Sequence, residues 1–298
     1  MSRIEEALQR ATTGGHARGI GSARDAKVAD DRTLGQYPEE VRSFGVRRGG
    51  HEATAARPIS APRTGPRQLV SFDASTEGKL IVQNAGPFAV EQYRRLAATM
   101  HELHVDRGLK TLMVTSALPR EGKTLTVTNL ALTLSESYRR RVLLIDADLR
   151  RPTVHEIFRL PNTRGLSEGL RPNAGELSVL EVSERLSVLP AGQPDGNPMA
   201  GLTSDRMQAV LSEAAATYDW VLLDAPPVGL MPDAPILARL SGAVLFVIGA
   251  GTTPFTLIQR SISDLGAECI VGTVLNRVDL GSVAHNRLYS SYYLPADE

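Results

Sequence analysis

Two hydrophobic periods alternate along the chain from about residue 88 to residue 276. Short, continuous apolar runs rich in strand-forming residues are separated by segments whose apolar residues recur at helical spacing. The runs predict strands at 112–115, 142–145, 220–223, 243–248 and 270–275, and the intervening pattern predicts helices at 90–104, 125–134, 234–240 and 258–265. This alternation predicts an α/β fold with a mostly parallel sheet flanked by helices on both faces.

The first 68 residues lack this pattern. Residues 12–68 are rich in Gly, Ala, Arg, Pro and Ser and contain few large apolar side chains, so they predict a disordered linker. Its arginines could contact anionic lipid or a partner, but interspersed acidic residues favour a solvated tether. Before it, residues 1–11 carry apolar positions on one face of a short, marginal helix. We therefore predict a domain at 69–288 and a C-terminal tail at 289–298.

Composition narrows the classes of function. The hydrophobic share of 42% suffices for a sizeable core, and a formal net charge of zero gives no electrostatic case for nucleic acid, so none is expected as a partner. The one cysteine, Cys269, permits no intramolecular disulfide and lies in an apolar run predicted to be a buried strand. No apolar run approaches the roughly 20 residues of a membrane-spanning helix. These features predict a cytoplasmic protein.

Residues 117–124, Ala-Leu-Pro-Arg-Glu-Gly-Lys-Thr, have the spacing of a phosphate-binding loop between a predicted strand and a predicted helix. In such a loop the backbone N–H groups and the helix dipole attract phosphate. Lys123 would neutralise the terminal phosphates, the Thr124 hydroxyl would bind magnesium, and Gly122 would let the backbone approach a phosphate.

Carboxylates follow two further predicted strands. Asp146 and Asp148 come after the run 142–145, and Asp224 follows the run 220–223 and precedes two prolines. Carboxylates at the ends of buried strands are costly unless a cation lies beside them, so these three residues suggest magnesium. An aspartate after a strand can also simply cap the next turn.

The order of these three motifs resembles the bacterial tyrosine kinases, the autokinases of capsular and exopolysaccharide synthesis. Their Walker A, Walker A′ and Walker B motifs fall here on residues 117–124, 143–150 and 221–227, and residues 188–192 resemble the family's loop before Walker B. The resemblance implies a P-loop NTPase fold of the kind found in MinD and ParA proteins. It also implies ATP and Mg²⁺ as ligands, and phosphoryl transfer to protein tyrosine.

Carried over motif by motif, the resemblance implies residue roles. Lys123, Asp146 and Asp148 would be catalytic, with the base either Asp146 or Asp148; Thr124, Asp146 and Asp224 would hold the metal. The nucleotide would contact Ala117, Pro119, Arg120, Glu121, Gly122, Lys123, Thr124 and Leu125. Asn276, which ends the last predicted strand, would bind adenine, although an asparagine there could equally begin a turn.

Two features would belong to assembly. Glu91 and Arg94 match the start of the family's E-x-x-R-x-x-R oligomerisation motif, whose third position is here Ala97; alternatively, they form an ordinary surface pair. Tyr289, Tyr292 and Tyr293 resemble the terminal cluster that these kinases phosphorylate on a neighbouring subunit, although tyrosines can also pack a terminal element.

The resemblance also implies a partner, a membrane chain-length regulator of polysaccharide export that recruits the kinase to the inner face of the cell membrane. Two other functions compete with this hypothesis. A MinD- or ParA-like positioning ATPase typically has a second lysine early in the loop, where this chain has Leu118. A non-catalytic ATP-binding adaptor is kept open by Arg120, which replaces the family's usual glycine, and by Ala97.

Overall fold

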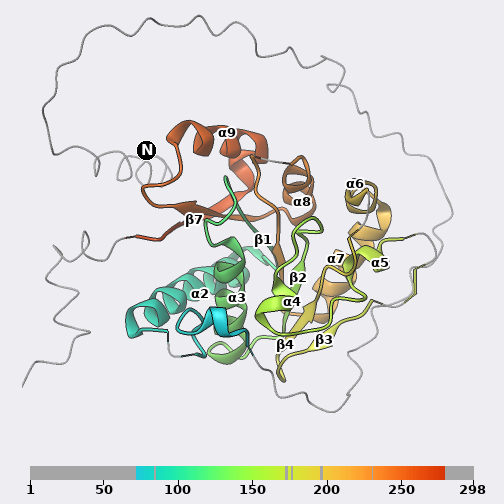
Figure 1. Cartoon of the computed structure of the whole chain (residues 1–298), viewed down its shortest axis with the longest axis horizontal. Helices are drawn as coiled ribbons and strands as arrows, with labels where there is room; N and C mark the ends of the chain where they lie inside the picture. The colour runs from blue at the N-terminus through green and yellow to red at the C-terminus, as the bar shows by residue number, and fades with distance from the viewer. Residues whose placement is uncertain are drawn as a thin grey trace, which may run out of the picture. The chain divides into compact units, whose positions relative to one another are not determined.

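The computed structural model describes residues 72–83, 85–171, 174–175, 177–194, 197–229 and 231–278 (Figure 1). The predicted short helix at 1–11, the linker at 12–68 and the tyrosines of the tail lie outside these residues. The described residues form an α/β domain, as the alternating pattern predicts.

A seven-stranded sheet with the order β3-β4-β2-β5-β1-β6-β7 forms the centre of the domain. Its strands are β1 (Thr111–Ser116), β2 (Val142–Asp146), β3 (Leu180–Glu181), β4 (Leu186–Leu189), β5 (Trp220–Asp224), β6 (Val244–Gly249) and β7 (Ile270–Asn276). Every pairing is parallel except that of the two-residue β3 with β4. The predicted, mostly parallel sheet is confirmed.

Helices cover both faces of this sheet. The longer ones are α2 (Pro87–Arg107), α3 (Lys123–Glu136), α7 (Asp205–Thr217), α8 (Asp233–Ser241) and α9 (Phe255–Leu265); the short ones are α4 (Val154–Ile157), α5 (Leu166–Gly169), α6 (Pro198–Leu202), η2 (Ala74–Thr76) and η3 (Ala267–Cys269). Because parallel crossovers are right-handed, α3 lies on one face while α7, α8 and α9, whose crossovers run the other way along the sheet, lie on the opposite face. Helix α2 packs beside α3 (Figure 1). No helix in the described ranges is both long and apolar enough to cross a bilayer.

Burial explains why the central strands read as continuous apolar runs. All residues of β2, β5 and β6 are buried, as a parallel strand covered on both faces requires. The hydrophobic core on the α3 side includes Trp220, Phe158 and Met100, which are at most 1% exposed. The helices on the two faces of the sheet thus cover the central strands.

The periphery of the sheet differs from the sequence predictions in two places. The sequence predicts a loop at 188–192, but Val188 and Leu189 end β4, because four residues are too few to reveal a period. It also predicts that Cys269 lies in a buried strand, whereas the residue ends η3, half-buried, just before β7. The strand β7 is at the edge of the sheet, where one side has no neighbouring strand among the described residues.

Candidate nucleotide-binding site

The carboxyl ends of the parallel strands β1, β2 and β5 lie together at one edge of the sheet. β2 and β5 are paired so that Asp146 lies directly beside Asp224, and β1, next to β5, leads into the loop at 117–122. Ligands of open parallel sheets bind at this carboxyl edge, near a strand from which the connections diverge. Here β1 is that strand, so the topology brings the three sequence motifs together.

Gly122 is the glycine that the loop geometry requires. It precedes α3 with a φ of 95° in the left-handed region, and a Cβ there would overlap the amide nitrogen of Asn276. A residue with a side chain would therefore be strained and would displace Asn276. The sequence argument for Gly122 is consistent with this local geometry.

The buried carboxylate of Glu121 ties the phosphate loop to β6. One of its oxygens accepts the N–H of Leu118 at 2.6 Å, and the other accepts the N–H of Gly249 at 3.0 Å and the hydroxyl of Thr253. The backbone oxygen of Glu121 accepts the Asn276 amide N–H at 2.8 Å. Asn276 thus supports the loop, and adenine binding by it stays a prediction.

Arg120 occupies a conformation that favours glycine. Its φ is 66°, in the left-handed region that costs a side-chain-bearing residue about 1 kcal/mol or more. This explains why glycine would be usual at the position. Arg120 retains the loop shape and adds an exposed guanidinium to the rim of the cavity.

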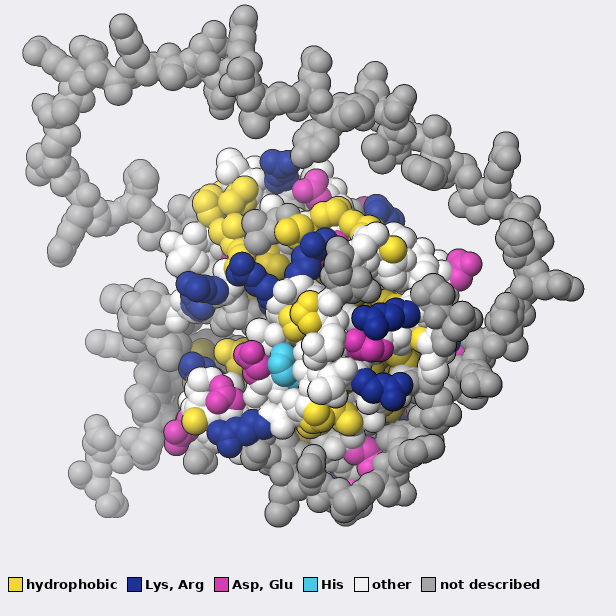
Figure 2. All heavy atoms as spheres, turned by 45° about the vertical axis from the view of Figure 1, so that its right-hand side comes forward, with side chains coloured by type: hydrophobic (Ala, Val, Ile, Leu, Met, Phe, Trp, Pro, Cys, Tyr) yellow, Lys and Arg dark blue, Asp and Glu magenta, His cyan; other side chains and the backbone are white. Residues whose placement is uncertain are grey.

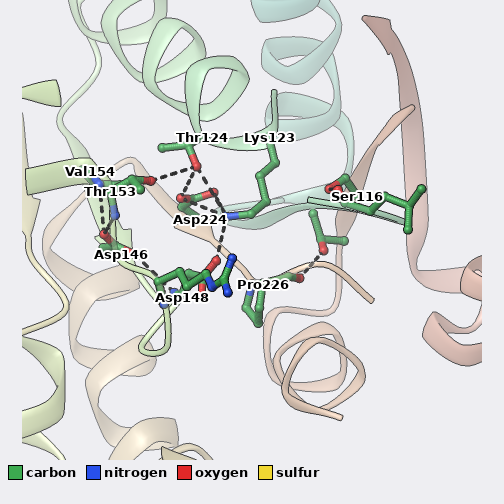
Figure 3. Close-up of polar contacts among 12 residues, drawn as sticks. Ser116, Lys123, Thr124, Asp146, Asp148, Thr153, Val154, Asp224 and Pro226 are labelled. Carbon is green, nitrogen blue, oxygen red and sulfur yellow. Dashed lines mark hydrogen bonds and ion pairs between the residues drawn. The ribbon is translucent and has the colours of Figure 1, made fainter. Parts of the chain in front are cut away.

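Lys123 points into a group of carboxylates. Its Nζ lies 3.0 Å from Asp148 Oδ2 and 3.3 Å from Asp224 Oδ1 (Figure 3). Burial opposes the ammonium charge, but the carboxylates of Asp224 and Asp148 outweigh it and raise the pKa of Lys123. The residue is therefore charged at neutral pH, as a phosphate-binding lysine must be.

Asp146 organises the turn that follows β2. Its Oδ2 accepts the N–H groups of Thr153 and Val154, each at 3.0 Å, and its Oδ1 accepts the N–H of Asp148 at 3.2 Å. Burial and the nearby carboxylate of Asp224 raise the pKa of Asp146 well above its ordinary value. Burial also raises the pKa of Asp224, against the opposing effects of Lys123 and the Thr124 hydroxyl.

The charges and oxygens fit a divalent cation. Three buried carboxylates lie near one ammonium, and burial raises the pKa values of Asp146 and Asp224 in spite of Lys123. The Thr124 hydroxyl donates to Asp224 Oδ2 at 2.7 Å, so a hydroxyl and a carboxylate oxygen already lie together. No three His, Cys, Asp or Glu side chains in the described ranges could hold a metal by themselves. Magnesium takes few protein carboxylates and completes its shell with phosphate and water.

A cavity of about 400 Å³ opens beside these groups. Its lining includes the predicted residues Pro119, Arg120, Gly122, Lys123, Thr124, Leu125 and Asp148, together with Arg150, Arg151, Thr153, Pro226, Pro227, Met231 and Arg277. Ala117 is buried behind the loop, where its oxygen accepts the N–H of Gly229 at 3.2 Å. The volume suits a small-molecule ligand.

Sequence reasoning missed three residues that support the site: Asp233, Thr153 and Thr253. Arg150 Nε donates to the buried Asp233 at 2.7 Å, which joins the turn after β2 to the start of α8. Thr153 places its hydroxyl 3.3 Å from that of Thr124. Thr253 contacts Glu121. An aspartate at the first position of a helix and a threonine after a D-x-D turn were visible in the sequence, but nothing local paired them with the motifs.

The residues on α2 that the sequence predicts for assembly, Glu91 and Arg94, do not form an ion pair with each other in the part of the chain that the structure describes. Glu91 pairs with Arg95, four residues further along the helix, at 3.3 Å. Arg94 is exposed, whereas Ala97 is fully buried in the core. The third position of the motif therefore faces the inside of the domain.

Comparisons with known proteins agree with this geometry. No protein-family model matches the chain. The tyrosine-protein kinase YwqD of Bacillus subtilis is 41% identical over 191 residues, which cover 62% of this chain and 80% of YwqD. The tyrosine-protein kinase etk of Escherichia coli is 34% identical over 206 residues, 67% of this chain but only 28% of etk.

Solved structures give the same result. The kinase domain of the Escherichia coli tyrosine kinase ETK superposes with a TM-score of 0.63 and 31% identity over 73% of this chain and 87% of that domain. The chimerical protein CapA2B2 does so with a TM-score of 0.61 and 28% identity, over 70% and 93%. The chain spans most of YwqD and about a quarter of etk. Taken with the site, these similarities show that the chain belongs to the bacterial tyrosine-protein kinase family.

Proposed function

We propose that this protein is an ATP-dependent protein-tyrosine autokinase that regulates capsular or exopolysaccharide synthesis and export. The observation that carries the proposal is that Lys123 Nζ lies within 3.4 Å of an oxygen of Thr124, of Asp148 and of Asp224, beside the cavity. Its substrates are ATP, with Mg²⁺, and tyrosine hydroxyls of Tyr289, Tyr292 and Tyr293.

Binding would use the loop first. The backbone N–H groups after β1 and the start of α3 attract the phosphates, and Lys123 moves from the carboxylates to the terminal phosphate. Thr124 and Asp224 would hold magnesium, directly or through water, and the metal would neutralise charge on the phosphates. Arg120 and Arg151, at the cavity rim, supply further positive charge.

Asp148 is the better base of the two candidates left open by the sequence. The oxygens of Asp146 already accept three backbone N–H groups. Asp148 lines the cavity; its Oδ1 accepts the N–H of Arg151 at 3.1 Å, and its Oδ2 pairs with Lys123 at 3.0 Å. Once Lys123 turns to phosphate, Asp148 can accept the tyrosine proton. A bond then forms between the tyrosine oxygen and the γ-phosphorus, and the bond from that phosphorus to the oxygen of ADP breaks.

The acceptor tyrosines would belong to a neighbouring copy of the chain, so the kinase acts as a homo-oligomer. Glu91 and Arg94 would lie at the contact between copies, without a third arginine. The membrane chain-length regulator of polysaccharide export is the proposed partner, and it would recruit this cytoplasmic protein to the inner face of the membrane. Titrating the cytoplasmic tail of such a regulator should stimulate phosphorylation.

Nucleic acid is not a proposed partner. The formal charge of the whole chain is zero, which gives no electrostatic case for nucleic acid, and the face drawn in Figure 2 carries both basic and acidic side chains.

Phosphosite mapping tests the proposal. The full chain is incubated with ATP and Mg²⁺, with and without the regulator tail, and its peptides are analysed by mass spectrometry. We expect phosphotyrosine at the three tail positions, and none in Lys123→Met or in the triple Tyr→Phe variant. Release of ADP without phosphotyrosine would favour a positioning ATPase, and bound but unconverted ATP would favour an adaptor.

A further inference from the structure

The hydroxyl of Thr153 faces the nucleotide cavity although its position in the chain would normally engage it elsewhere. Thr153 immediately precedes α4, where a threonine side chain usually accepts a backbone N–H of the first helical turn. Here its side chain makes no such bond. The carboxylate of Asp146 instead accepts the N–H groups of Thr153 and Val154, so the hydroxyl is released from that role.

The released hydroxyl is directed at the predicted metal ligands. Thr153 Oγ1 lies 3.3 Å from Thr124 Oγ1, which in turn lies 2.7 Å from Asp224 Oδ2 (Figure 3). Thr124 Oγ1 therefore lies close to two other protein oxygens, Thr153 Oγ1 and Asp224 Oδ2. Both Thr124 and Thr153 line the cavity, so their side chains border the space that a nucleotide would enter, with the buried Asp224 behind Thr124.

These separations match those of oxygens that share a magnesium shell. With Mg–O distances near 2.1 Å and octahedral angles, adjacent ligand oxygens lie about 3.0 Å apart. The observed 2.7 Å and 3.3 Å bracket that value. We propose that Thr153 is a further magnesium-shell residue, which contacts the ion or one of its waters through Oγ1, and the inference rests on the proposed function of this site.

Asp146 then has a defined supporting role. It fixes the backbone of Thr153 through a 3.0 Å hydrogen bond and so aims the hydroxyl at Thr124. Carboxylates that orient the ligands of a metal in this way are common outer-shell partners. Thr153 differs in this respect from threonines whose hydroxyls donate to helix carbonyls, such as Thr217, which donates to Glu213 O at 3.0 Å.

Calorimetric titration of the full chain with ADP, in Mg²⁺ and separately in EDTA, tests this role without relying on activity. Thr153→Val removes the hydroxyl at nearly constant shape, Thr153→Ser retains it, and Thr217→Val is the matched control on α7. We expect Thr153→Val to weaken Mg²⁺-dependent ADP binding about tenfold and to leave binding in EDTA within about twofold of the native value. Thr153→Ser and Thr217→Val should match the native protein in both titrations.

Two results would overturn the inference while leaving the proposed function intact. One is native affinity of Thr153→Val for ADP in Mg²⁺. The other is an equal loss of its affinity in Mg²⁺ and in EDTA, because the hydroxyl would then act only through packing. If native protein itself binds ADP equally well in both solutions, the magnesium site fails, and the proposed function fails with it. Thermal unfolding of each variant identifies one that does not fold, in which case Thr153→Ala replaces Thr153→Val.

Discussion

Replacing Asp233 by Asn tests whether the contact between α8 and the turn after β2 stabilises the site. Asp233 is 2% exposed and accepts from Arg150 Nε at 2.7 Å and from Nη2 at 3.4 Å. A hydrogen bond between charged groups contributes about 1.5–3 kcal/mol, but the Arg150 side chain is 35% exposed and can recover water. Asp233 also begins α8, where a negative charge adds about 0.5 kcal/mol. The expected loss in the free energy of unfolding is about 2 kcal/mol.

Urea unfolding of the full chain measures this loss, and Asp264→Asn is the matched control. Asp264 pairs with Arg260 on α9 at 3.9 Å with both side chains exposed, so its loss should cost less than about 0.5 kcal/mol. A double-mutant cycle with Arg150→Met should give a coupling energy of about 1 kcal/mol or more. The reasoning is refuted if Asp233→Asn costs no more than Asp264→Asn.

Three other substitutions examine the loop and the carboxylates. Gly122→Ala should destabilise the fold about 1 kcal/mol more than Gly242→Ala in urea unfolding and should also abolish ATP binding; both glycines have positive φ, but only the first lacks room for a Cβ. Equal losses would contradict this. Glu121→Gln should cost about 1–3 kcal/mol and weaken ATP binding in calorimetry, because an amide NH₂ would face a backbone N–H, and unchanged binding would argue against it. Burial raises the pKa values of Asp146 and Asp224, so between 3.8 and these raised values the folded, ligand-free protein binds more protons than the unfolded chain. The free energy of unfolding therefore falls as the pH rises from 3.8 through the raised pKa values. Asp224→Asn should flatten that fall in urea unfolding across the pH range; an unchanged slope would be inconsistent with the assigned cause.

The sequence predicted those parts of the fold that have long, regular signals. β2, β5 and β6 are buried on both faces and therefore appear as apolar runs, and the loop at 117–124 has a fixed spacing. By contrast, β4 is only four residues long, so Val188 and Leu189 were predicted to lie in a loop. Cys269 was predicted to lie in a buried strand, but it ends η3 just before the edge strand β7.

The site was predictable as far as its residues lie within motifs. Lys123, Thr124 and Asp224 were found because each follows a strand within a recognisable pattern. Asp233 and Thr153 make their contacts with residues that are distant in the sequence, Arg150 and Thr124, and the tertiary fold brings these residues together. The raised pKa of Asp146 likewise depends on its burial and on the β2–β5 register that places Asp224 beside it, and no local pattern contains that register.

The central claim is that this site transfers phosphate from ATP to the terminal tyrosines of another copy. Full-length Lys123→Met, which keeps its tyrosines, is mixed with the triple Tyr→Phe variant, which keeps its site, in ATP and Mg²⁺ with the regulator tail. Mass spectrometry of the Lys123→Met chain should find phosphotyrosine at positions 289, 292 and 293 in the mixture and none when either variant is incubated alone. Phosphotyrosine on Lys123→Met alone, or none in the mixture while native protein is phosphorylated, would contradict the account.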